Sequence, residues 1–175
     1  MTSRISDSIR VARAADAPAI AAVHVGAWRE TYAGLVPAHV LSGLSVDRRT
    51  EAWGRIISKP EAFNSSAVFV AEREGAVVGF GCCGLQRAEN LNAQGYDGEI
   101  SAIYLLRSFQ RCGLGLALMS AIGQELQRRG RKPMGSWREP EGLPILRETR
   151  RRHRWVQEGY SPEWCCLCRG SVRLA

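Results

Sequence analysis

The feature that most constrains this chain is a glycine-containing turn between a β-rich run and a long amphipathic stretch. The turn is Gln110-Arg111-Cys112-Gly113-Leu114-Gly115, and residues 98–105 before it alternate as a strand does. Residues 114–129 after it predict a helix that ends at Gly130, since their apolar side chains fall on one stripe, namely Leu114, Leu118, Ile122 and Leu126. A helix start of this kind presents unpaired backbone N–H groups and the positive end of the helix dipole. We therefore expect a phosphate, most naturally a pyrophosphate, to bind at this turn.

The string of residues in this turn is not decisive by itself. Glycines between a strand and a helix are as often a geometric requirement as a binding site. The turn also lacks the Lys-Ser or Lys-Thr pair of a Walker loop and the third glycine of the dinucleotide fingerprint. Both of those nucleotide-binding classes are therefore excluded, and the phosphate interpretation depends on the strand-turn-helix context.

The rest of the N-terminal three quarters predicts an α/β fold. Two β-rich runs, 67–73 and 76–85, flank Glu74-Gly75 and indicate a hairpin. Upstream of it, apolar spacing and helix start signals predict a short strand near residues 9–12 and three helices, over 18–31, 37–44 and 46–57. The polar stretch 86–97 is expected to be a loop. These elements indicate one domain over 1–175, with a mixed, mostly antiparallel sheet flanked by helices.

Composition narrows the partners and the compartment. With 24 Lys and Arg against 17 Asp and Glu, the formal charge is +7, which favours anionic partners such as nucleotides, phosphates or nucleic acid. No stretch approaches the roughly 18 apolar residues that span a bilayer, and the polar N-terminus lacks the apolar region of a signal peptide. We therefore expect no membrane contact and a cytoplasmic location.

The six cysteines are expected to be reduced thiols in that compartment. Cys82 and Cys83 lie in a predicted strand, and Cys112 lies in the glycine turn. A third group, Cys165, Cys166 and Cys168, lacks the second pair of a zinc ribbon. Inert thiols are favoured over a metal site, and no metal is predicted.

Two segments resemble a known family. The run from Gly98 to Gly115, with the amphipathic helix after it, resembles the acetyl-CoA motif of the GNAT superfamily of N-acetyltransferases. The segment from Ala27 to Pro37 is similar to the first helix and following loop of many bacterial members. The resemblance covers residues 8–130 and implies a GNAT-like fold, acetyl-CoA as cosubstrate, and acetyl transfer to a primary amine.

The resemblance also implies which residues bind the coenzyme. The backbone of Ile103 and Leu105 would pair with the pantetheine arm as an added strand does. Gln110 stands where the family has Gln or Arg. The pyrophosphate would be held by the backbone amides of five residues, Arg111, Cys112, Gly113, Gly115 and Leu116.

Catalytic and acceptor residues follow by the same resemblance. Glu99 is the candidate base that takes the ammonium proton, directly or through water, and the alternative is an exposed carboxylate at a strand end. Trp28 and Tyr32 would line the acceptor pocket, and the alternative is that they are core aromatics. The acceptor stays open between a small-molecule amine and a peptide amine, and a homodimer is plausible by analogy.

Residues 131–175 depart from the family pattern. The expected strand and closing helix are not legible there, and residues 147–154 hold five arginines and His153. One hypothesis is a one-base change of reading frame between about Arg131 and Trp137, which the nucleotide sequence of codons 128 to 145 would test. It would leave a catalytically impaired GNAT-fold protein. A basic nucleic-acid-binding module built on the arginine run is the alternative of a different class.

Overall fold

The computed structural model of the chain describes residues 6–132. Its sheet has four antiparallel strands in the order β1-β2-β3-β4, formed by Asp7–Val11, Ser65–Arg73, Ala76–Leu85 and Gly98–Leu105. The predicted hairpin is present between β2 and β3. Glu74 and Gly75 form its turn with φ of 53° and 80°, the left-handed conformation that matches the twist of a two-residue hairpin.

The predicted helices are present within a few residues of their expected bounds. They are α1 (Ala17–Tyr32), α2 (Ala38–Ser42), α3 (Val46–Ser58) and α5 (Leu114–Arg128). Short 3-10 turns precede α1 at Ala14–Asp16, follow α3 at Pro60–Phe63 and follow β4 at Arg107–Phe109. The expectation of an unbroken loop over 86–97 is wrong, because α4 (Glu89–Ala93) lies within it. Leu91 is the only large apolar residue of α4, so no apolar spacing marks a helix face there.

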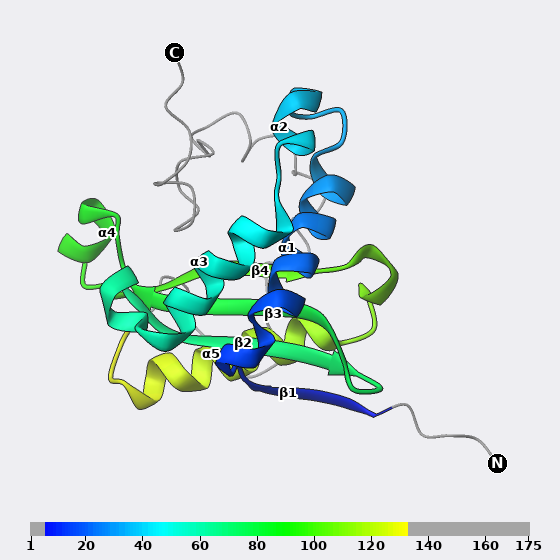
Figure 1. Cartoon of the computed structure of the whole chain (residues 1–175). Coiled ribbons are helices and arrows are strands. Elements are labelled where there is room, and N and C mark those ends of the chain that lie inside the picture. The colour runs from blue at the N-terminus through cyan, green and yellow to red at the C-terminus, as the bar shows by residue number, and fades with distance from the viewer. Residues whose placement is uncertain (1–5, 133–175) are drawn as a thin grey trace. The chain divides into compact units, whose positions relative to one another are not determined.

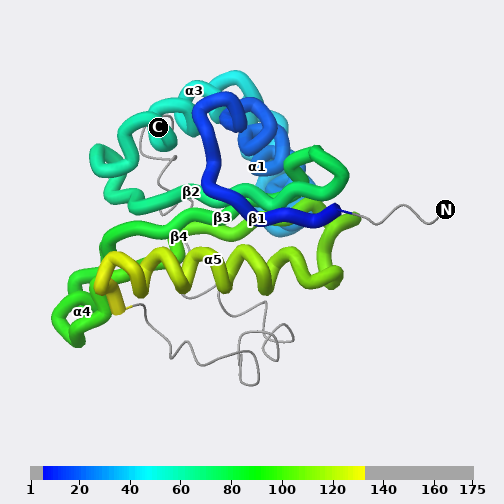
Figure 2. Tube along the Cα trace, turned by 90° about the horizontal axis from the view of Figure 1, so that it is seen from below, coloured from blue at the N-terminus to red at the C-terminus, as the bar shows by residue number. Residues whose placement is uncertain are grey.

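The sheet separates two layers of helices. Figures 1 and 2 show α5 along one face and α1 with α3 on the other. The α5 face is closed by the predicted apolar stripe, since Leu118, Ile122 and Leu126 are fully buried. At the centre of this face Gly81 leaves room for the helix, because a Cβ there would lie 2.7 Å from Cδ1 of Ile122. The α/β class is therefore confirmed for the described residues.

An aromatic cluster fills the opposite layer. His24 of α1 is only 1% exposed and stacks on Tyr104 of β4, with 5.1 Å between the ring centroids. Trp53 of α3 and Phe80 of β3 pack against each other with ring centroids 4.8 Å apart. The cluster therefore joins α1 and α3 to β3 and β4.

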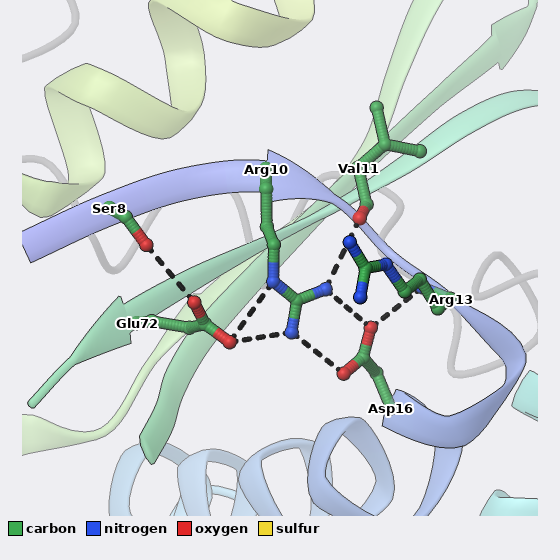
Figure 3. Close-up of polar contacts among 6 residues, drawn as sticks. All are labelled: Ser8, Arg10, Val11, Arg13, Asp16 and Glu72. Carbon is green, nitrogen blue, oxygen red and sulfur yellow. Dashed lines mark hydrogen bonds and ion pairs between the residues drawn. The ribbon is translucent and has the colours of Figure 1, made fainter. Parts of the chain in front are cut away.

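A polar network ties the start of the chain to the sheet and to α1 (Figure 3). The Arg10 guanidinium donates to both carboxyl oxygens of Asp16, at 2.7 and 2.9 Å, and to Oε1 of Glu72, at 2.5 and 3.0 Å. Ser8 donates its hydroxyl to the other oxygen of Glu72. The hydrogen bond from Arg10 lowers the pKa of Asp16 to about 2. One guanidinium thus bridges two carboxylates where β1, β2 and the start of α1 meet.

Several expectations concern residues outside 6–132. The cysteine cluster at 165–168, the arginine run 147–154, the single domain over 1–175 and the reading-frame hypothesis all depend on residues beyond those described. Within the described part, no helix combines the length and apolar character needed to cross a bilayer.

Candidate active site

Among the described residues, the outer edge of β4 has no neighbouring strand, and at its start the Gly98 amide donates to the Lys132 carbonyl at 3.3 Å. The Leu106 amide donates to the Val78 carbonyl at 3.1 Å, which makes these two residues a hydrogen-bonded pair. Hydrogen-bonding direction alternates along an antiparallel strand, so Tyr104 also faces β3 while the peptide groups of Ile103 and Leu105 face outward. The two residues expected to pair with an added strand therefore have their backbone groups on the open edge.

The glycine turn follows directly from this edge. The Gln110 side-chain amide donates to the Leu105 carbonyl at 3.1 Å, and the Cys112 thiol donates to the Phe109 carbonyl at 2.9 Å. These bonds fold residues 106–113 back over the end of β4. Arg111 has a φ of 59°. This left-handed conformation is unfavourable in free energy for any residue that carries a side chain.

The two glycines of the turn have different structural roles. Gly113 is the residue before α5 and has a φ of 91°, while a Cβ there would meet nothing within 4 Å. Glycine is needed there for its backbone conformation rather than for lack of space around a side chain. A Cβ on Gly115 would lie 3.3 Å from Cδ1 of Leu105, so this glycine allows the helix to approach β4 closely. Leu116 is exposed on the first turn of α5.

Arg73 lies beside this turn. Its guanidinium carbon is 5.8 Å from the centroid of the Phe109 ring. Asp7 accepts two hydrogen bonds from it, both 2.7 Å long, and these bonds raise the pKa of Arg73. No local motif marks Arg73 in the sequence, because it reaches the turn from the end of β2.

Glu99 lies at the opposite end of β4 from the turn. Leu105 is six residues further along, or about 20 Å at roughly 3.3 Å per residue. The Glu99 carboxylate accepts the Arg87 backbone amide at 3.1 Å and forms an ion pair with the Arg87 guanidinium. The side chain is 19% exposed, so it is a half-buried, paired carboxylate rather than the freely exposed one of the alternative interpretation.

The structure distinguishes between the two aromatic candidates. Trp28 is 8% exposed and packs against His24, with ring centroids 5.9 Å apart, which favours a core role. Tyr32 lies one helical turn later, 4.9 Å from the Trp28 ring, and is only half-buried. Tyr32 is therefore the better placed of the two to reach a ligand at the end of α1.

The comparisons with known proteins agree with this geometry. Residues 28–140 match the model of the acetyltransferase (GNAT) family. The uncharacterized N-acetyltransferase YuaI of Bacillus subtilis (strain 168) is 37% identical over 157 residues, covering 89% of this chain and 80% of that protein. The chain therefore belongs to the GNAT family, whose members are acetyl-CoA-dependent acyltransferases.

Two solved structures share the fold. One is the PaiA N-acetyltransferase of Thermoplasma acidophilum, solved in complex with coenzyme A, with a TM-score of 0.60 at 16% identity. The match covers 72% of this chain and 75% of the PaiA chain. The other is YncA of Salmonella typhimurium, described as a putative acetyltransferase with its cofactor acetyl-CoA, with a TM-score of 0.53 at 25% identity. This match covers 72% of this chain and 66% of the YncA chain.

Proposed function

We propose that this chain transfers an acetyl group from acetyl-CoA to a primary amine. The observation that carries the proposal is the continuity of the open edge of β4 with the glycine turn at the start of α5. Backbone groups of the edge can pair with an extended amide-containing arm, and the turn can hold a phosphate. An extended arm that ends in a pyrophosphate is the chemistry of coenzyme A.

The residues at the turn fit that coenzyme. The first four amides of a helix have no acceptor within the helix, and α5 begins directly after Gly113, where the position of a Cβ is open. We assign the pantetheine arm to the backbone of Ile103 and Leu105. We assign the pyrophosphate to the amides of the turn from Arg111 to Leu116, with Gln110 holding the turn through the Leu105 carbonyl. The Arg73 guanidinium lies beside the turn, where it is already paired with Asp7.

The chemistry requires a proton acceptor. Acetyl-CoA, when bound, would supply a thioester carbonyl for attack by a neutral amine, so that a C–N bond forms as the C–S bond breaks and coenzyme A leaves as its thiolate. The attacking nitrogen must lose a proton, and we assign that proton to Glu99, directly or through a water molecule. The Arg87 ion pair would hold the Glu99 carboxylate in place until the amine arrives.

The acceptor would approach from the end of α1. Tyr32 would contact it and Trp28 would support the Tyr32 ring from behind. A small-molecule amine and a peptide amine both fit this description. We also propose the cytoplasm as the location, which is consistent with Cys83 and Cys112 forming no disulfide among the described residues. A homodimer stays an expectation by family analogy.

Calorimetric titration with acetyl-CoA tests the coenzyme half of this proposal. We expect saturable binding of one molecule per chain. Release of free coenzyme A in the presence of an amine panel, containing polyamines, aminoglycosides and short peptides, tests the transfer. A folded sample that binds no acetyl-CoA would rule the function out.

A further inference from the structure

The end of α1 and the segment after β4 are joined by one pair of residues. The backbone amide of Arg107 donates to Oε2 of Glu30 at 2.8 Å. The Arg107 guanidinium in turn donates through Nη2 to the backbone carbonyl of Glu30 at 2.5 Å. These two residues are 77 positions apart in the chain.

Each residue of the pair caps the element of the other. Glu30 lies in the last turn of α1, where backbone carbonyls have no donor within the helix. Arg107 is the first residue of the 3-10 turn that follows β4, where the backbone amide likewise has no partner within the turn. The side chain of each residue therefore satisfies an unpaired backbone group of the other, and the charge of each suits the end that it caps.

A second contact brings α1 close to the segment that follows β4. Gly26 faces Leu106, and a Cβ on Gly26 would lie 3.0 Å from Cδ2 of that leucine. The Leu106 amide is fixed to Val78 of β3 on its other side. The start of the glycine turn is thus held between the sheet and α1, and Glu30 is its polar attachment to α1.

The attached segment leads directly into the proposed coenzyme site. Phe109 donates its amide to the Leu106 carbonyl, and the Gln110 amide donates to Arg107, so the backbone from 106 to 110 is a continuous hydrogen-bonded unit. A shift at Arg107 would therefore move the amides that precede α5. At the other end of the contact, Tyr32 lies two residues beyond Glu30 in α1.

We propose that Glu30 is a positioning residue, which holds the coenzyme turn against α1 and couples coenzyme binding to the acceptor end of that helix. This inference rests on the proposed function, because it assigns a determinant of affinity to the same acetyl-CoA site. Glu30 touches neither the coenzyme nor the acceptor in this account. It acts through the backbone of Arg107.

Three single variants test the affinity. Glu30→Ala removes the acceptor of the Arg107 amide and should weaken acetyl-CoA binding about tenfold, the scale of one lost hydrogen bond to a charged group. Glu30→Gln keeps an oxygen that accepts from that amide, so its affinity should stay within about threefold of the parent. Glu51→Ala removes a carboxylate from the exposed surface of α3 and should leave affinity unchanged. Calorimetry measures all three below their melting temperatures.

Hydrogen exchange tests the coupling. The amides of Leu35 and Val36 both donate to the Tyr32 carbonyl at the end of α1, at 3.0 and 3.2 Å, and report on that end. Acetyl-CoA should slow their exchange in the parent chain. In Glu30→Ala, at a coenzyme concentration that saturates the variant, this protection should be lost while the first turn of α5 stays protected.

Three results would overturn the inference: parental affinity in Glu30→Ala, equal weakening in Glu30→Ala and Glu30→Gln, or exchange at Leu35 and Val36 that ignores the coenzyme in the parent. Failure of the proposed function is distinguished from these results, because the parent chain would then bind no acetyl-CoA at all.

Discussion

Trp53 donates its indole Nε1–H to Nδ1 of His24 across the interface between α3 and α1, at 3.2 Å. Because Nδ1 is the acceptor, the neutral imidazole carries its proton on Nε2. Burial, with a smaller contribution from the positive charge of Arg49, lowers the pKa of His24 to about 3. His24 is therefore a neutral core residue, and its hydrogen bond orients the Trp53 ring.

Stability should consequently depend on pH through His24. The unfolded chain takes up a proton at this histidine as the pH falls through about 6.5, and the folded chain does not until about pH 3. The contribution of His24 to the free energy of unfolding should be constant above pH 7. At pH 5 it should be about 2 kcal/mol lower, by the usual 1.36 kcal/mol per unit of pKa difference. Urea denaturation at both pH values measures this difference.

The matched control for this prediction is His24→Gln. Its amide oxygen can still accept from Trp53, but the side chain does not titrate. The variant should lose most of the pH dependence between 7 and 5. An equal loss of stability in the parent and the variant over that range would assign the effect to other groups.

Gly113→Ala should weaken acetyl-CoA binding at least tenfold, because a side chain at a φ of 91° distorts the turn or projects into the space before the α5 amides. Gly130→Ala is the matched control at the other end of the same helix. Gly130 has a φ of 68° and, like Gly113, no atom within 4 Å of the added Cβ. Both variants should lose about 1–2 kcal/mol of stability from the left-handed conformation, measured by thermal or urea denaturation. Equal coenzyme affinities in the two variants would contradict the assigned phosphate site.

Arg10→Gln should destabilise the fold by about 2 kcal/mol, because Asp16 and Glu72 then repel each other without a shared cation. The effect stays below that of a fully buried pair, since the Arg10 side chain is 29% exposed. Arg13→Gln is the control, because Arg13 bonds Asp16 through its backbone amide, which the substitution retains. Urea denaturation at pH 7 compares the two, and equal losses would show that charge alone, rather than the bridging geometry, is responsible.

Glu99→Gln should lower kcat by about a hundredfold or more, the usual contribution of a general base, and leave acetyl-CoA affinity within about twofold. The amide oxygen can still accept from Arg87, so the fold should be preserved. Steady-state rates with the best acceptor from the amine panel measure the effect, and Glu89→Gln on the exposed surface of α4 serves as control. A parental kcat would leave Glu99 as a structural partner of Arg87 alone.

Local patterns were sufficient for most of the secondary structure. The hairpin follows from two β-rich runs around Glu74-Gly75, and α5 follows from a stripe of leucine and isoleucine that ends before glycine. These signals are readable because the faces of a strand and a helix repeat every 2 and 3.6 residues. The helix α4 was not predicted because Leu91 is its only large apolar residue, so no spacing marks a buried face.

The residues of the candidate site likewise divide into those that local sequence patterns indicate and those that only packing brings together. The sequence by itself determined the strand-turn-helix unit, since the two glycines, the strand and the helix are contiguous from Gly98 to Arg128. Only the tertiary structure showed that Glu30 caps the turn, that Arg73 lies beside it and that Glu99 is paired with Arg87. Apolar periodicity specifies which face of an element is buried. It carries no information about which polar side chains from distant parts of the chain meet once those faces have packed.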